Sequence, residues 1–181
     1  MGGDMDEAKL PETIVMLHAA VDVEARRLHV LHGARLRCAR GCSACCVDEL
    51  SVSAVEAEHI RRQHGALLAS GRPHPIGACA FLDGAGACRI YAERPYVCRT
   101  QGLPLRWLAD DERGRGPAQG PTELRDICPL NEAGEPIELL RAEDCWTLGP
   151  IEERLARLQL ATDAPAERVR LRSLFASREP P

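Results

Sequence analysis

The sequence has few aromatic residues and no excess of positive charge. Only 3% of its 181 residues are Phe, Trp or Tyr, so we expect a core built mostly from Leu, Val, Ile and Ala. The formal net charge is -4 at pH 7, which argues against a general nucleic-acid-binding surface. We therefore expect no nucleic-acid partner.

The sequence also lacks a long apolar segment. Its longest apolar stretch, residues 14–23, is interrupted by His18 and Asp22 and is much shorter than the roughly 20 residues of a membrane-spanning helix. The first residues include Asp4 and Asp6 where a secretory signal has a basic segment followed by an apolar run. We therefore expect a soluble, cytoplasmic protein without a membrane partner.

The usual catalytic fingerprints are missing as well. We find no Gly-rich nucleotide loop, no Ser/His/Asp set and no internal repeat, and Asp83-Gly84-Ala85-Gly86 has the composition of a tight turn. The histidines do not cluster, and we interpret the following as surface or packed residues: His18, His32, His59, His64 and His74. Whether the chain is an enzyme stays open at this point.

Apolar residues at helical spacing predict a mainly α fold. We expect a long helix over residues 11–35, and a second over 53–69 that begins with a Ser53/Glu56 capping box. Further helices are predicted at 150–158 and 166–175, with a short hairpin or tight loop at 79–91 and an exposed connection at 109–122. We expect these helices to pack around an irregular cysteine-rich centre in a single domain, residues 11–176, between flexible tails at 1–10 and 177–181.

What the sequence does have is cysteine. Nine cysteines are hard to explain as disulfides in a reducing compartment, and an odd number cannot all pair within one chain. Four of them lie within nine residues, at Cys38, Cys42, Cys45 and Cys46. Because a tight turn can point two thiols separated by two residues into one tetrahedral site, Cys42 and Cys45 are the best candidate pair of metal ligands. We expect Cys46 to point elsewhere, toward a neighbouring metal or a polynuclear cluster.

A second group of cysteines can complete such a site. Cys79 and Cys88 flank the expected hairpin, Cys98 follows ten residues later, and Cys128 offers a further thiol. Arg94 and Arg99 are candidate cationic neighbours that would lower the cost of gathering several thiolates. We interpret Cys145, which adjoins Trp146, as a packed residue.

These motifs resemble a known family. The ordered set Cys38-x-x-Gly41-Cys42-x-x-Cys45-Cys46, Cys79-x-Phe81-Leu82 and Cys88-x-Ile90-Tyr91-x-x-Arg94-Pro95-x-x-Cys98-Arg99 is similar to the YkgJ family of cysteine-cluster proteins, described as zinc- or iron-chelating domains with a CxxCxxCC signature. The resemblance covers about residues 36–131. Cys38 stands one residue further out than that signature places its first cysteine. The resemblance implies metal chelation and leaves the reaction, if any, open.

We therefore predict a metal-binding protein that chelates zinc or iron, the latter as single ions or as an iron-sulfur cluster, through thiolates. The candidate ligands are Cys38, Cys42, Cys45, Cys46, Cys79, Cys88, Cys98 and Cys128. Zinc is the preferred metal, because tetrahedral thiolate sites need no assembly machinery. The alternative is an iron-sulfur or dithiol redox protein that supports modification of another macromolecule, with an unidentified protein partner.

Overall fold

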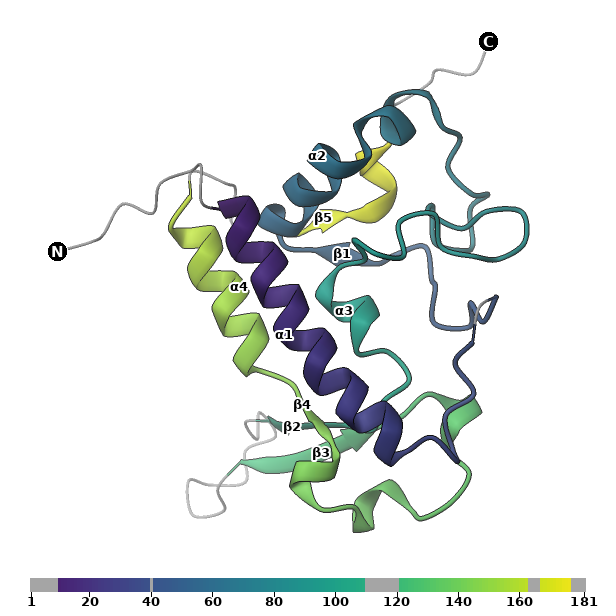
Figure 1. Cartoon of the computed structure of the whole chain (residues 1–181), viewed down its shortest axis with the longest axis vertical. Coiled ribbons are helices and arrows are strands. Elements are labelled where there is room, and N and C mark those ends of the chain that lie inside the picture. The colour runs from purple at the N-terminus through teal and green to yellow at the C-terminus, as the bar shows by residue number, and fades with distance from the viewer. Residues whose placement is uncertain (1–9, 40, 110–120, 163–166, 177–181) are drawn as a thin grey trace, which may run out of the picture.

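The computed structural model describes residues 10–39, 41–109, 121–162 and 167–176. Its helices are α1 (Leu10–Leu31), α2 (Ala54–Ser70), the short α3 (Tyr96–Arg99) and α4 (Pro150–Leu160). Its strands are β1 (Ser51–Val52), β2 (Leu105–Ala109), β3 (Thr122–Asp126), β4 (Trp146–Thr147) and β5 (Val169–Arg170). Helices α1 and α4 lie side by side, and long loops cover the opposite side of α1 (Figure 1).

Helix α1 follows the apolar pattern of its sequence. Ile14, Leu17, Val21, Ala25 and Leu28 recur every three or four residues, and all five are buried, as an amphipathic helix requires. The helix ends at residue 31, before the predicted end at residue 35. Turns take over there, and glycine at position 33 favours helix termination because it costs about 1 kcal/mol within a helix.

Helix α2 begins as the sequence predicts. The Ser53 side chain accepts a hydrogen bond from the Glu56 amide, while the Glu56 side chain returns to the backbone of Ser53. This capping box satisfies amide groups that the first turn leaves without partners. The helix ends at Ser70, next to Gly71, so its existence and both of its boundaries agree with the prediction to within one residue.

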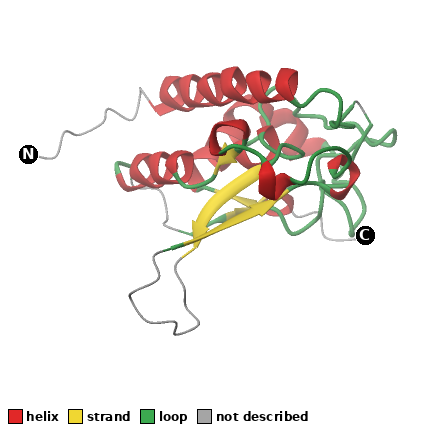
Figure 2. Ribbon diagram, turned by 90° about the horizontal axis from the view of Figure 1, so that it is seen from below, coloured by secondary structure: helices red, strands yellow, loops and turns green. Residues whose placement is uncertain are grey.

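The expected mainly α fold is correct only in part, because two small sheets accompany the helices. Strand β2 pairs antiparallel with β3, from Leu105 opposite Asp126 to Ala109 opposite Thr122, and parallel with β4. The strands lie to one side of the helices (Figure 2). Strand β1 pairs antiparallel with β5 and connects positions far apart in the sequence.

The predicted C-terminal helix at 166–175 is wrong. Its described part forms β5 and then a 3₁₀ turn, Leu171–Leu174. The alternation that lets Val169 and Leu171 face the protein also fits a strand, and pairing with β1 satisfies backbone groups that a helix would satisfy internally. The predicted helix at 150–158 is confirmed as α4.

Two apolar clusters form the core. One centres on α1 and includes Tyr96 of α3, Trp146 of β4 and Leu155 of α4. The other centres on Phe81, which is fully buried, and packs α2 against the loop over residues 79–90 and against the C-terminal 3₁₀ turn. The two clusters lie on different sides of α2, because Val55 belongs to the first and Ala57 to the second.

The loop over residues 79–91 is a tight turn with a single bridge. Asp83 and Ala87 are hydrogen bonded across it, the Asp83 carboxylate accepts the amides of Ala85 and Ala87, and Leu82 pairs with Cys88. The expected tight loop is therefore present, without a regular hairpin. Most of the expected connection at 109–122 and nearly all of both expected tails lie outside the described residues. Within the described part of the chain, no helix combines the length and apolar character needed to cross a bilayer.

Candidate functional site

The first cysteine segment is a pair of turns between α1 and β1. The amide of Cys42 donates to the carbonyl of Ala39, and the amide of Cys46 donates to the carbonyl of Ser43. Gly41 has a φ of 88°, a left-handed conformation that favours glycine. Glycine therefore suits the turn that precedes the Cys42–Cys45 pair.

The thiols of Cys45 and Cys46 interact with each other. A hydrogen bond from Cys46 lowers the pKa of the Cys45 thiol to about 6, and the same bond is the main cause that raises the pKa of Cys46. The two adjacent thiols therefore affect each other's pKa, and the expectation that Cys46 serves a neighbouring metal or a polynuclear cluster stays a prediction. Such an arrangement makes Cys45 the thiol of the pair that more readily becomes a thiolate, the form that binds metal.

Three further cysteines lie close to Cys46. The amide of Cys79 donates to the carbonyl of Cys46 over 2.8 Å, and the bridge between Leu82 and Cys88 returns Cys88 toward Cys79. Cys79 belongs to the apolar cluster around Phe81, and Cys46 and Cys88 pack against that cluster. Cys98, on α3, belongs to the same region: burial first, and then the charges of the thiols at 79, 88 and 45, raise its pKa to about 12. We call Cys46, Cys79, Cys88 and Cys98 the inner cysteine group.

Two further candidate ligands, Cys38 and Cys128, are hydrogen bonded to Asn131, which is fully buried. Its side-chain amide donates to the Cys38 sulfur over 3.4 Å and to the Gly102 carbonyl over 2.8 Å, and its oxygen accepts the Arg37 amide. The amide of Asn131 donates to the Cys128 carbonyl over 2.7 Å.

Cys38 also has other thiols near it. Burial first raises the pKa of Cys38, and the charges of Cys42, Cys128 and Cys45 raise it further. Its sulfur is approached closely by the backbone at Gly102, where an added Cβ would lie only 2.4 Å away. We call Cys38, Cys42 and Cys128 the outer cysteine group.

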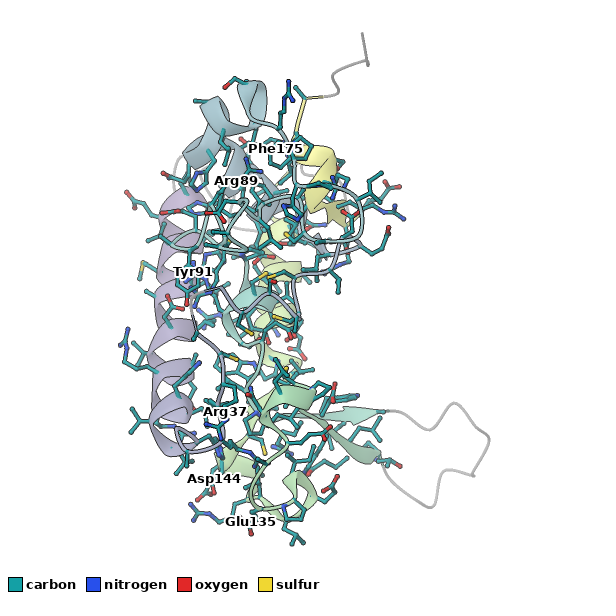
Figure 3. The ribbon with its side chains drawn as sticks, turned by 90° about the vertical axis from the view of Figure 1, so that its right-hand side faces the viewer. Arg37, Arg89, Tyr91, Glu135, Asp144 and Phe175 are labelled. Atoms are coloured by element: carbon teal, nitrogen blue, oxygen red, sulfur yellow. The ribbon has the colours of Figure 1, made fainter. Side chains whose placement is uncertain are left out.

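No three or more Cys, His, Asp or Glu side chains of the described residues converge on a point that could hold a metal ion. Figure 3 shows sulfur atoms (yellow) at several places along the loop side of the molecule, without a common centre. The fit to a metal therefore rests on the chemistry of the donors. All nine cysteines are free, and thiolates are the ligands that both zinc and iron-sulfur clusters use.

Positive side chains lie close to two of the inner thiols. Arg172 and Arg89 lower the pKa of Cys79, although burial has the larger effect and raises it overall. Arg94 and Arg89 act in the same way on Cys88, where burial again dominates. These cations would offset part of the negative charge of a thiolate cluster, as the sequence predicts for Arg94.

The same cations hold the loops that carry the cysteines. Arg89 donates to the Ala80 carbonyl over 2.7 Å, and Arg172 donates to the carbonyls of His74 and Ala78 over 2.7 and 2.9 Å. Arg172 also pairs with Asp48. Sequence reasoning missed the roles of Arg89 and Arg172. The partners of Arg172 are far away in the chain, and those of Arg89 are carbonyls on the other side of the loop over residues 79–91.

Arg99 does not face the thiols, contrary to its expected role. Its guanidinium pairs with Asp22 over 2.5 Å and donates to the carbonyl of Ala92 and to Nδ1 of His18. The other ring nitrogen of His18 lies 3.3 Å from the carboxylate of Glu56. Arg99 thus connects α3, immediately after Cys98, to α1.

Glu56 connects α2 to the start of α3. Its carboxylate accepts the Tyr96 amide over 2.7 Å and the Ser53 hydroxyl over 2.9 Å, and the residue is buried. Burial by itself raises the pKa of Glu56, but hydrogen bonds from His18, the Tyr96 amide and Ser53 outweigh burial and leave the pKa below its usual range. A buried carboxylate and a buried arginine therefore fix the short helix that carries Cys98.

A cavity of about 590 Å³ lies between α2, α3 and α4. Val97, Leu105 and Leu155 are among the residues that line it, together with polar groups such as Gln101, and none of the nine cysteines is among them. The cavity and the cysteine groups are therefore separate features of the described structure.

Residues 37–114 match a family model for a CxxCxxCC domain, described as a "Putative zinc- or iron-chelating domain". The match covers less than half of the chain and includes the candidate ligands from Cys38 to Cys98. Comparisons with curated proteins and with solved structures give no match. The similarity supports metal binding and is consistent with either zinc or iron.

Proposed function

We propose that this protein chelates zinc through the thiolates of its cysteine groups. The observation that carries the proposal is that loops and α3 bring Cys46, Cys79, Cys88 and Cys98 into one region. Four thiolates are the donor set of a structural zinc site. The proposed ligands are the seven cysteines of the inner and outer groups and, as the eighth, Cys45.

A bound metal ion would offset the cost of deprotonating thiols that are buried or lie near one another. Burial raises the pKa of Cys79, Cys88 and Cys98, so without a cation these side chains keep their protons at neutral pH. Zinc stabilises the deprotonated form directly, and its binding releases protons. Folding and metal binding are then coupled, because most of the proposed ligands lie on loops between the helices and strands, and a bound metal ion would cross-link these loops.

The test is the metal content of the reduced full chain. We expect protein prepared with zinc, and without chelator, to retain at least one zinc per chain, measured by elemental analysis. Cys98→Ser should lower this content, whereas Cys145→Ser should leave it unchanged, because the sulfur of Cys145 lies near Arg125 and away from both cysteine groups. Metal content near zero under these conditions would overturn the proposal.

The same donors suit an iron-sulfur cluster, which is the competing function. Cys45 and Cys46 form a contacting thiol pair beside further cysteines, a crowding that also suits a polynuclear centre. Anaerobic preparation with iron and sulfide separates the two cases. A brown protein with broad visible absorption would replace zinc by an iron-sulfur cluster and favour a redox or accessory role; a colourless protein with stoichiometric zinc supports chelation.

A further inference from the structure

Helix α1 is apolar on its outer side as well as on the side that packs into the core. Between residues 13 and 25, every exposed residue is apolar: Val15, Met16, Ala19, Ala20 and Val23. We call these five residues the outer face of α1. A surface helix normally carries polar or charged residues on its outer side, and a contiguous exposed apolar patch marks an interaction surface. We propose that this face pairs with the outer face of α1 in a second copy of the chain, in antiparallel orientation.

The outer face is open in the described part of the chain. Helix α1 lies along one edge of the molecule, and none of the described elements lies beyond it (Figures 2 and 3). Its larger side chains are exposed by 51% at Val15, 72% at Met16 and 64% at Val23. The stretches of sequence outside the described residues contain no Val, Ile, Leu, Phe, Tyr or Trp, and Met only at positions 1 and 5. They offer little apolar surface, which favours a cover from another chain.

The spacing of residues along this side of α1 fits a pair of helices. Intervals of four, three, four and three residues separate Glu12, Met16, Ala19, Val23 and Arg26, and this repeat forms the seam between two paired helices. With 3.6 residues per turn, the five positions lie within about 80° of one another around the helix. Ala19, at the middle of the seam, has no side-chain atom beyond Cβ, so two such helices can approach closely there.

The charges at the two ends of the seam favour a second copy as the partner. Glu12 and Arg26 are exposed, and neither forms an ion pair within the described residues. In an antiparallel pair whose two-fold axis passes near Ala19, Glu12 of each copy lies opposite Arg26 of the other, and Met16 lies close to Val23 of the other. A two-fold interface has to be self-complementary in this way. A parallel pair would instead bring like charges together at both ends.

The size of the seam predicts a weak and reversible dimer. Residues 12 to 26 span about 21 Å of a helix that is about 10 Å wide, so roughly 200 Å² of helix face is covered on each copy. A standard stable interface buries about 800 Å² on each partner. We therefore expect a dissociation constant in the upper micromolar range. The inference concerns a surface without cysteines and does not depend on the proposed metal binding.

Sedimentation equilibrium over a concentration series measures the pairing of the full chain. The chain is prepared with zinc and kept reduced, because all nine cysteines are free and disulfides would link copies artificially. We expect a reversible monomer–dimer equilibrium. Ala19→Lys places two like charges beside the two-fold axis and should weaken the dimer by at least about tenfold. Both Ala and Lys are good helix formers, so circular dichroism should show an unchanged fold. Ile76→Lys, at a loop position that is 88% exposed, is the matched control and should pair like the unmodified chain.

Exchange of charges tests the antiparallel orientation. Glu12→Arg and Arg26→Glu should each weaken the dimer by about threefold to tenfold, because each variant replaces two attractive pairs by two repulsive ones. An equal mixture of the two variants should restore pairing, since opposite charges then meet at both ends of the mixed dimer. In a parallel pair, Glu12→Arg would only exchange one repulsion for another, so an unchanged dissociation constant for this variant would overturn the proposed orientation.

Methionine methyl NMR provides a measurement on the unmodified chain. The chain has three methionines, of which only Met16 lies on the outer face, and Met16→Leu assigns its signal. This signal should shift with concentration. In a mixture of labelled and unlabelled chains, an isotope-filtered spectrum should show a contact between the Met16 methyl group and a valine of the other copy. A chain that stays monomeric at every concentration, or a dimer that Ala19→Lys leaves intact, would overturn the pairing. The first of these results would assign the outer face to a different protein.

Discussion

Replacing Glu56 by glutamine keeps the shape of a buried side chain and removes its charge. In the protein this carboxylate accepts hydrogen bonds from the Tyr96 amide over 2.7 Å and the Ser53 hydroxyl over 2.9 Å, and it lies 3.3 Å from the His18 ring. Hydrogen bonds to a charged group contribute about 1.5 to 3 kcal/mol each. The amide retains one acceptor, so we expect Glu56→Gln to lower the free energy of unfolding by about 3 kcal/mol.

Urea unfolding of the zinc-loaded chain at pH 7, followed by circular dichroism, measures this loss. Glu58→Gln is the matched control on the same helix, because Glu58 is 42% exposed and pairs with Arg62 at the surface. Such pairs contribute about 0 to 1 kcal/mol, so the control should stay close to the unmodified protein. A Glu56→Gln chain within about 0.5 kcal/mol of the unmodified one, below the usual effect of a single hydrogen bond, would refute the reasoning.

The pH dependence of the same difference is a second check. The pKa of Glu56 is lower in the folded chain than its usual value, so its stabilisation is fully present above the unfolded value of about 4.3. It is lost as the pH falls through the lower folded pKa. The stability difference between the unmodified chain and Glu56→Gln should therefore be constant from pH 5 to 7 and shrink in more acidic solution. Zinc loss in acid affects both chains and cancels in the comparison.

Three further predictions test the contacts that hold the two cysteine groups and the contribution of metal to stability. Gly102→Ala should reduce stability and weaken zinc binding by the outer group, because the added Cβ would lie 2.4 Å from the Cys38 sulfur and the backbone φ is +89°. Gly134→Ala is the control, because its φ is +106° and no atom lies within 4 Å of the added Cβ. This variant should show only the backbone strain of about 1 to 2 kcal/mol. Calorimetry and zinc content measure both, and equal effects would contradict the close contact. Arg172→Ala should weaken metal binding by about tenfold, as loss of a supporting group does. Arg170→Ala loses only an exposed ion pair with Glu49 and should bind metal like the unmodified chain. Competition with a chelator measures both variants. A strong chelator should lower the midpoint of thermal unfolding substantially, and an unchanged midpoint would mean that metal does not support the fold.

Local sequence patterns predict the helices well for physical reasons. Residues 14 to 28 of α1 repeat at helical spacing, and the Ser53/Glu56 capping box marks the start of α2, so both signals are contained within a few residues. Strands β1, β4 and β5 have two residues each, which is too short for an alternating pattern. Their pairing depends on partners elsewhere in the chain, as β1 with β5 shows, and a sequence pattern does not contain that information.

The candidate site could be predicted only as a set of residues. Cysteine spacing indicates the thiols, but the segments that carry them are held by hydrogen bonds from Asn131 and Arg172 to backbone groups that are distant in the chain. Asn131 carries one available signal, because it follows Cys128 within the short segment Cys128-Pro-Leu-Asn131. The sequence does not reveal the hydrogen bond from Asn131 to Cys38, because the two residues are 93 positions apart and come into contact only in the folded chain.

The pairing of β1 with β5, and the contacts of Arg172 with the loop over residues 74–78, have a consequence for the order in which the protein is made. All cysteines of the inner group are synthesised before this C-terminal segment, which follows Cys98 by roughly 70 residues. Domains fold largely as units once their contacts can form. A ribosome-bound chain therefore exposes its inner thiols before the contacts of β5 and Arg172 can form. Under the proposed function, this leaves an interval during synthesis in which a metal ion would enter the inner group from solution.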